Sequence, residues 1–367
     1  MRRNCFPETW LCAAILLAMS ISPATAVELC QMCAAPFGGD SGPKDLTGLS
    51  LEELYNLDIV QPNVLGGHTH PAGQAMFGYE YMHMSMSGLF QGSHEVSPAT
   101  VFTEGFGTVH TSMEMDMHMF DVMYAPTEQL TLMAMLPDKT MAMEHLKSNG
   151  GVFRQSAEGL GDLEVMGMVT LLGDIRKGGN RLILNLGVSL PTGSINVKDH
   201  AEGDSSKPLV LLEYFMQLGS GTYDLMPGLT YLGDSGPWSW GLQSVETFRL
   251  GKNDHDYRLG DEYHLSAWAS YGVTDWFAPS IRLDGRSWGN ITGKDKGLDA
   301  NPTPESRPNL RGGRRLDLLL GINFYAPKGF LKGSRLMIEG GIPVYQNLDG
   351  PQLGTAWTLS AGLTYAF

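Results

Sequence analysis

The last twelve residues constrain the fold of this 367-residue chain more than any other segment. Between Ala356 and Phe367, large apolar side chains alternate with small or polar ones. The apolar positions are Trp357, Leu359, Ala361, Leu363, Tyr365 and Phe367. Successive side chains of a β-strand point to opposite faces, so this period of two predicts a strand with one apolar face and one polar face.

The first residues predict export. Arg2 and Arg3 precede an apolar run over residues 10–21, and small residues at Ala24 and Ala26 define a cleavage point. This order of charge, apolar run and small residues is that of a signal peptide. The run is shorter than the roughly 20 residues that cross a bilayer as a helix. We therefore predict a signal peptide over residues 1–26, cleaved near Ala26.

Beyond about residue 72 the chain divides into alternating segments separated by turn residues. The predicted strands are 74–91, 108–125, 129–143, 159–173, 180–192, 215–232, 237–250, 261–275, 276–291, 313–326, 333–346 and 355–367. A chain without a helical span can cross a membrane only as a closed barrel. About twelve strands, with short connections alternating with mostly longer polar ones, fit a bacterial barrel. We predict an all-β antiparallel transmembrane barrel over residues 72–367; a soluble β-sandwich is the alternative.

Composition supports this class and limits the partners. Only 17% of the residues are charged, Gly is abundant at 46, and the formal charge is −14. A negative chain does not favour nucleic acid, whereas a negative lumen or surface would favour cations. A final strand ending in Phe367 also resembles the assembly signal of outer-membrane barrels. The expected location is the bacterial outer membrane, and the expected partners are its lipid, the barrel-assembly machinery and a small solute or metal ion.

Residues 27–71 form a short leader between the predicted signal peptide and the predicted barrel. Ser50 and Glu53 have the spacing of a capping box, so residues 51–60 are predicted to form one helix. The leader could lie in the lumen as a small plug or in the periplasm. Its Cys30 and Cys33 could form a disulfide in an oxidising compartment or bind a soft metal.

Methionine is concentrated in the first third of the predicted barrel. Fourteen of the 21 Met lie between residues 82 and 168, mostly at every second position. Apolar neighbours such as Phe77 and Tyr79 are predicted to face lipid, so the Met side chains should line one wall of the lumen over four strands. The same register turns Glu114 and Asp116 outward, which requires a bulge there or a position above the bilayer.

Thioether sulfur is a soft ligand that suits Cu(I) or Ag(I). The candidate metal-binding residues are Met82, Met84, Met86, Met115, Met117, Met119, Met133, Met135, Met166, Met168, His68, His70, Cys30 and Cys33. Further histidines on the predicted strands or loops are His83, His110, His118 and His145. No resident cofactor is predicted, and Cu(I) or Ag(I) would be cargo or ligand. The alternative is that Met is a flexible apolar filler that packs the leader or an inner wall.

Signals for an enzyme are weak. The segment Gly-Asp-Ser-Gly-Pro occurs at 39–43 and again at 233–237, and it looks like the surroundings of a serine-protease nucleophile. Gly and Pro dominate both copies, which favours tight turns. A barrel-embedded lipase would need a lipid-facing Ser–His pair, for which His264 is the candidate on the later strands. We therefore predict no catalytic residues and no enzyme.

Three segments carry a family resemblance. Gly-Leu-Gly-Asp-Leu at 159–163, Leu-Asn-Leu-Gly-Val-Ser-Leu-Pro-Thr-Gly at 184–193 and Gly-Ser-Gly-Thr-Tyr-Asp at 219–224 resemble the putative MetA-pathway of phenol degradation family. The resemblance extends over most of residues 72–367. It implies a barrel fold and a transport role, and it supplies no catalytic residues. The Met-rich first third departs from a generic channel for aromatic compounds.

The sequence therefore predicts an outer-membrane channel or transporter, with soft, copper-type cations as one class of cargo for the Met-rich lumen. Two alternatives remain open at this point. One is a structural or adhesive barrel whose lumen is closed and whose Met residues serve as packing. The other is a channel for small aromatic or hydrophobic compounds.

Overall fold

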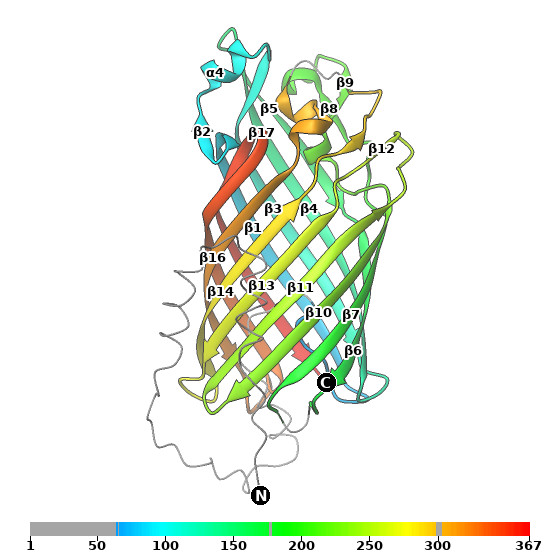
Figure 1. The fold of residues 1–367 in the computed structure, drawn as a ribbon, viewed down its shortest axis with the longest axis vertical. Helices are drawn as coiled ribbons and strands as arrows, with labels where there is room; N and C mark the ends of the chain where they lie inside the picture. The colour runs from blue at the N-terminus through cyan, green and yellow to red at the C-terminus, as the bar shows by residue number, and fades with distance from the viewer. Residues whose placement is uncertain (1–63, 65, 176–177, 299–302) are drawn as a thin grey trace, which may run out of the picture. The chain divides into compact units, whose positions relative to one another are not determined.

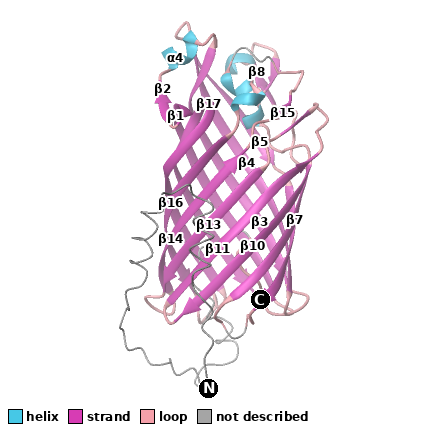
Figure 2. Cartoon of the chain, in the orientation of Figure 1, coloured by secondary structure: helices cyan, strands magenta, loops and turns pink. Residues whose placement is uncertain are grey.

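The computed structural model describes residue 64 and residues 66–175, 178–298 and 303–367. The predicted signal peptide, the predicted helix at 51–60, Cys30 and Cys33 lie outside the described residues. Figure 1 shows the described chain as a barrel of tilted strands, and Figure 2 shows that strand is by far its main secondary structure. Among the described residues, no helix is both long and apolar enough to cross a membrane.

Eleven strands form the closed ring, and neighbours in the ring are also neighbours along the chain. They are β1 (Ala75–Gly92), β3 (Thr108–Tyr124), β4 (Leu130–Lys147), β6 (Leu163–Leu172), β7 (Arg181–Leu190), β10 (Tyr223–Ser235), β11 (Trp238–Leu250), β13 (Glu262–Tyr271), β14 (Phe277–Trp288), β16 (Gly313–Tyr325) and β17 (Ser334–Ala366). β17 pairs with β1 and closes the ring. The predicted all-β antiparallel barrel is confirmed.

The strand β17 crosses the barrel twice. Every pair of neighbours in the ring is antiparallel, and a closed ring can alternate in direction only with an even number of crossings. Residues 335–348 of β17 pair with β16, and residues 348–366 pair with β1. The ring therefore has twelve crossings, and the predicted strands at 333–346 and 355–367 correspond to the two halves of β17.

Shorter elements gather at the end of the barrel opposite the short turns, which we take as the extracellular end. They are β2 (His94–Val96), α4 (Pro98–Thr103), β5 (Val152–Leu160), β8 (Lys198–His200), η1 (Ala201–Gly203), β9 (Leu209–Leu211), η2 (Tyr214–Met216), β12 (Tyr257–Arg258), β15 (Thr292–Gly293), η3 (Pro304–Ser306) and η4 (Pro308–Leu310). β5 falls mostly within a region that the sequence predicted as a loop. It pairs with the upper half of β4, from Asp138 to Leu146.

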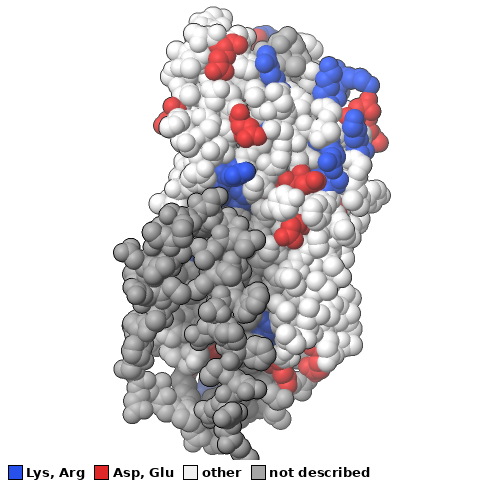
Figure 3. Space-filling view, viewed as in Figure 1, with Lys and Arg blue, Asp and Glu red and all other residues white. Residues whose placement is uncertain are grey.

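Alternation along the strands separates an apolar exterior from a mixed interior. On β7, Leu186 and Val188 are exposed on the outer face, whereas Arg181, Asn185 and Ser189 are buried on the inner face. β17 follows the same rule near its end, where Trp357 is exposed. On the face seen in Figure 3, charged side chains gather mainly near the extracellular end, and the described surface below them is mostly uncharged. That uncharged surface is the expected lipid contact.

The outward acids of β3 are accommodated by a polar patch on the outer wall. His83 Nε2 lies 3.1 Å from Glu114 Oε2, and His83 Nδ1 lies 2.9 Å from Asp116 Oδ1. Tyr81 donates a hydrogen bond of 2.5 Å to Asp116. The bulge in β3 lies at the other side of Ser112, so it does not change the direction of either acid. We therefore place this level of β1 and β3 above the bilayer.

Candidate functional site: the barrel lumen and its two plugs

The Met residues named from the sequence line one side of the lumen, which we call the methionine wall (the inner faces of β1, β3, β4 and β6). Strand register places many of them directly opposite one another. The opposed pairs include Met82 with Met117, Met84 with Met115, Met86 with Met113, Met113 with Met143, Met123 with Met133, and Met133 with Met166. Opposed residues on neighbouring strands have Cβ atoms about 4.5–5.5 Å apart. The Met side chains of each pair are therefore close enough to touch.

The upper part of the methionine wall packs against loops that enter the extracellular mouth. We call residues 191–222, 289–298 and 303–312 the extracellular plug. The apolar cluster there joins Met84, Met86, Met113, Met141 and Met143 of the wall to Leu212, Met216 and Leu218 of the plug. Flexible thioethers fill irregular gaps between such surfaces. At this end the Met side chains therefore act as packing.

The lower part of the wall packs against the end of the leader. Val64 is buried in one cluster with Met76, Met123, Met133, Met166 and Met168, together with Ile183, Leu232 and Trp268 from other strands. We call Val64 and residues 66–70 the periplasmic plug. The prediction left this segment in the lumen or in the periplasm, and the structure places its described part in the lumen.

Polar contacts fix the periplasmic plug to the barrel. Asn185 donates a 3.1 Å hydrogen bond from Nδ2 to the Gly66 carbonyl, and the His70 amide donates a 3.0 Å hydrogen bond to Thr131 Oγ1. Gly66 has φ +66°, and a Cβ there would lie 2.8 Å from the sulfur of Met166. The chain therefore needs glycine at this point, because it turns in a left-handed conformation against the methionine wall.

His68 and His70, which the sequence offered as metal ligands, lie inside the barrel within the periplasmic plug. Their ring centroids are 5.0 Å apart in an edge-to-face arrangement. His70 Nδ1 is 2.8 Å from Gln74 Oε1. Among the described residues, one group of three His, Cys, Asp or Glu side chains could reach a single metal ion. It does not include His68 or His70 and lies at the extracellular end.

The opposite side of the lumen carries ion pairs, and we call it the charged wall (the inner faces of β10, β11, β13, β14, β16 and the first half of β17). Its pairs are Asp224 with Arg249, Arg282 with Asp284 and Glu339, Arg286 with Asp284, and Arg315 with Asp317. Glu339 and Asp284 are almost fully buried. Buried carboxylates remain ionised when cations are placed beside them.

Neither enzyme signal forms a catalytic arrangement. His264 faces the lumen, where its Nε2 lies 2.7 Å from Asp284 Oδ2, so it does not supply a lipid-facing Ser–His pair. The Gly-Asp-Ser-Gly-Pro segment at 233–237 covers the end of β10 and the two-residue turn to β11, where Gly236 has φ +58°. The copy at 39–43 lies outside the described residues.

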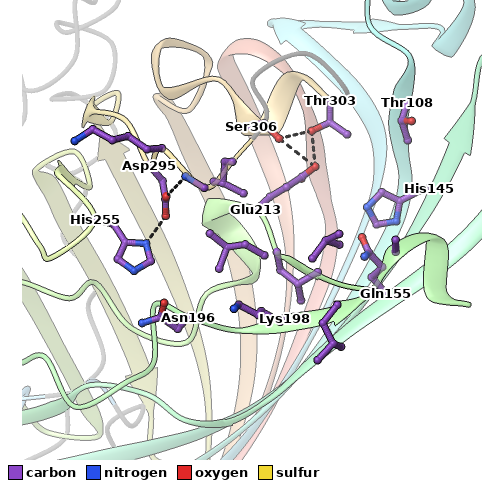
Figure 4. Close-up of a pocket in the computed structure, with 18 of the residues that line it drawn as sticks. Thr108, His145, Gln155, Asn196, Lys198, Glu213, His255, Asp295, Thr303 and Ser306 are labelled. Atoms are coloured by element: carbon purple, nitrogen blue, oxygen red, sulfur yellow. Dashed lines mark hydrogen bonds and ion pairs between the residues drawn. The ribbon is translucent and has the colours of Figure 1, made fainter. Parts of the chain in front are cut away.

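A cavity of about 840 Å³ lies between the extracellular plug and the tops of β3, β4 and β5 (Figure 4). His145 and Glu213 line one part of it, and His255, hydrogen-bonded to Asp295, lines another. Thr303 donates a hydrogen bond to Glu213 Oε1. Burial opposes ionisation of Glu213, but the charge and contact of His110 hold the pKa of this carboxyl below its usual range.

Four side chains beside this cavity form what we call the histidine–carboxylate cluster: His110, His145, Glu213 and Glu305. His110 of β3 stands directly opposite His145 of β4, and their ring centroids are 4.6 Å apart. His110 Nε2 lies 2.9 Å from Glu213 Oε2, and its Nδ1 lies 3.1 Å from Glu305 Oε2. The sequence singled out both histidines but not the two acids, which come from plug segments about 70–195 residues away along the chain.

The three segments that carried the family resemblance meet in one place, which we call the clasp. Asp162 accepts hydrogen bonds from the Gly193 amide at 2.9 Å and from the Ser220 amide at 2.7 Å. A Cβ on Gly193 would lie 2.8 Å from the Gly219 Cα and 2.9 Å from the Gly161 carbonyl carbon. The motifs therefore hold the extracellular plug to the tops of β6, β7 and β10.

Comparisons with known proteins agree with this architecture. Residues 99–317, more than half of the chain, match the family model described as Putative MetA-pathway of phenol degradation. Among solved structures, an outer membrane channel from Pseudomonas putida F1 is similar at 14% identity and TM-score 0.56, covering 84% of this chain and 100% of that chain. At this identity the likeness concerns the fold alone. Among curated proteins, none matches the sequence.

Two further solved structures are similar at lower scores. The β-domain of the Bordetella autotransporter BrkA has 12% identity and TM-score 0.41, and the match covers 80% of this chain and 100% of that chain. The KdgM porin has 8% identity and TM-score 0.37, with 79% of this chain and 99% of that chain covered.

Proposed function

Since the chain belongs to the putative MetA-pathway of phenol degradation family, we propose that it is an outer-membrane channel that carries a small solute by diffusion and is closed in the conformation described here. The observation that supports this proposal is a closed twelve-crossing barrel with a polar inner side and a separate plug at each end. A barrel with no such role can fill its lumen with wall side chains alone. This barrel instead fills both ends with chain segments, and channel opening would require these segments to move aside.

Opening would require at least one movement at each end. The periplasmic plug is held mainly by the apolar cluster around Val64 and by a few hydrogen bonds such as that of Asn185 to Gly66. The extracellular plug is held by the clasp and by the upper methionine cluster. Segments that gate channels come from the parts of a fold with lower local stability.

Single-channel conductance of the mature protein in planar bilayers tests this proposal. Wild-type protein should give rare openings, and a variant lacking residues 64–70 should open more often and longer. Leu320→Ala, a change on the lipid-facing side of β16, should behave as wild type. Silence from the shortened variant, with the barrel correctly folded, would contradict the channel and favour a structural or adhesive barrel.

Soft, copper-type cations are a second candidate for cargo. The observation that supports them is the set of opposed thioethers in the middle of the methionine wall, between the two plugs. Met82, Met115, Met117 and Met119 are only partly buried, and Met82 stands opposite Met117. A row of adjacent thioethers on one wall offers a soft cation successive sites of similar affinity.

Binding of Cu(I) to refolded protein separates this cargo from a small aromatic solute. Replacing Met82, Met115, Met117 and Met119 together by Leu should lower the number of Cu(I) equivalents bound while the barrel stays folded. Cys30→Ser and Cys33→Ser should be present in both proteins, so that thiolates do not contribute. Equal Cu(I) binding by the two proteins would contradict the soft-cation cargo and leave the channel proposal intact.

A further inference from the structure

The histidine–carboxylate cluster holds buried polar atoms that its own residues do not satisfy. His110 is fully buried between Glu213 and Glu305, yet neither ring nitrogen makes a hydrogen bond of normal geometry with either acid. Oε2 of Glu213 and both carboxylate oxygens of Glu305 are also buried without such a bond. Buried polar atoms left in this state are costly, and they are a common sign of an ion or water at the site.

The spacing of the donors suits one metal ion. One ligand atom from each of His110, His145 and Glu213 can be chosen so that all three lie within 4.8 Å of one another. Zinc binds imidazole nitrogen at about 2.0–2.1 Å and carboxylate oxygen at about 2.0–2.2 Å. Two donors at these bond lengths on one tetrahedral ion lie about 3.3 Å apart, so His110 and Glu213, which are 2.9 Å apart, would separate slightly around the ion.

We propose that His110, His145 and Glu213 bind one divalent transition-metal ion of the Zn(II) class. Two imidazoles and one carboxylate form a borderline-hard donor set, which suits Zn(II) better than the soft Cu(I) considered for the thioethers. A water or solute in the adjoining cavity would complete the tetrahedral coordination, since His145 and Glu213 both line that cavity.

The residues around the proposed ligands support the same assignment. Glu305 lies 3.1 Å from His110 Nδ1, the nitrogen turned away from Glu213. A metal-bound histidine usually donates its second N–H to a carboxylate or carbonyl, which fixes its tautomer and orientation. Thr303 donates to Glu213 Oε1, which leaves Oε2 directed at His110. Glu305 and Thr303 are therefore positioning residues.

The ion would connect the wall to the extracellular plug. His110 and His145 belong to β3 and β4, whereas Glu213 lies just before η2 and Glu305 lies in η3. Occupancy would thus tie two plug segments to the barrel and favour the closed conformation. Binding at the site does not depend on the proposed channel function; only the effect of the ion on opening does.

Metal binding can be measured directly on the mature protein, refolded in detergent, treated with a chelator and carrying Cys30→Ser and Cys33→Ser. Titration with ZnCl₂, followed by metal analysis after desalting, should give one equivalent bound. His145→Ala and the nearly isosteric Glu213→Gln should each weaken Zn(II) binding at least about tenfold, and Glu305→Gln should weaken it about 10–100-fold. Co(II) bound in place of Zn(II) should show the visible absorption of a four- or five-coordinate site.

The matched control is His255→Ala. His255 lines the same cavity but faces a single carboxylate, Asp295, and it should leave the stoichiometry unchanged. Glu213→Gln keeps the shape of the side chain, so it tests the site if a histidine variant fails to fold. The proposal is overturned if the wild-type protein binds no Zn(II), or if Glu213→Gln binds it as tightly as wild type. A protein that binds Zn(II) but never conducts would contradict the channel and leave the metal site standing.

Discussion

The two walls of the lumen carry different side chains and make different contacts. The methionine wall packs against both plugs through apolar thioether contacts, with polar contacts such as His70 to Thr131 and His110 to Glu213 beside them. The charged wall pairs its own side chains, as Arg282 does with Glu339 and Arg315 does with Asp317. The methionine wall therefore contributes most of the thioether packing on the plugs, whereas the charged wall mainly pairs its own side chains and adds Leu232 and Trp268 to the cluster around Val64.

The difference follows from how each interaction depends on geometry. Apolar contact with flexible thioethers is non-directional, so this part of the contact tolerates a shift of the plug. Buried ion pairs are directional, and removal of one partner leaves an uncompensated charge. A channel with plugs needs both behaviours, since its frame must stay rigid while the segments inside it move.

The largest loss of stability should come from removing an ion pair of the charged wall. In Arg282→Met, Glu339 would lose its bidentate partner while it remains buried, because Arg282 Nε lies 3.1 Å from both carboxylate oxygens. We expect the free energy of unfolding to fall by about 3–5 kcal/mol. Urea unfolding in detergent or lipid measures this loss.

The matched variant for that prediction removes both charges. Arg282→Met combined with Glu339→Gln should recover much of the lost stability, since no buried charge is then left alone. If the double variant is as unstable as Arg282→Met, the loss does not come from a buried charge without a partner. The charged wall would then not differ from the methionine wall in depending on ion pairs.

The next effect should come from the upper methionine cluster. Met113 is fully buried between the wall and the extracellular plug, opposite Met86 and Met143. Met113→Ala should lower the free energy of unfolding by about 2–5 kcal/mol because it leaves a cavity. Met113→Leu conserves volume and should cost less than about 1.5 kcal/mol. Comparable losses for Ala and Leu would mean that the thioether does more than fill space.

The sequence predicts those features of the structure that depend on residues close together along the chain. Alternation is local, so all twelve barrel crossings and the inward direction of Met82 and Met166 follow from period two. β5 was missed because it pairs with β4 through a tight turn inside a polar stretch. The periplasmic plug could not be placed, since nothing local distinguishes a segment that enters the lumen from one that stays outside.

The sites depend on contacts between distant residues. The sequence showed His110 and His145 as isolated histidines among many, and they stand opposite each other because the register shifts at the β-bulge between His110 and Ser112. Glu213 and Glu305 lie in loops, and loops have no periodic sequence pattern from which their course could be predicted. The family motifs at 159–163 and 184–193 were visible, but their meeting in the clasp through Asp162 and Gly193 depends on the folded loop.

The clasp stands where the methionine wall ends and the charged wall begins, and its loss should have a smaller effect. Asp162→Asn keeps one carbonyl oxygen but loses the second acceptor, so it can no longer bind the amides of both Gly193 and Ser220. A hydrogen bond to a charged group contributes about 1.5–3 kcal/mol, which is the expected loss of stability. Protease cleavage within residues 191–222 should increase before the barrel itself unfolds. Unchanged cleavage would show that the methionine wall alone holds the extracellular plug.

The smallest effect should come from one hydrogen bond of the periplasmic plug. Asn185→Ala removes the donor to the Gly66 carbonyl, although Thr230 Oγ1 remains 3.5 Å from that oxygen. Such a bond contributes about 0.5–1.5 kcal/mol, so the plug should leave the lumen up to about tenfold more often. Single-channel open probability measures this change, and Leu184→Ala on the outer face of β7 is the control. If open probability stays the same while Met166→Ala raises it, the periplasmic plug is held by the methionine wall alone. The contrast between the methionine wall and the charged wall would then be sharper than the hydrogen bonds suggest.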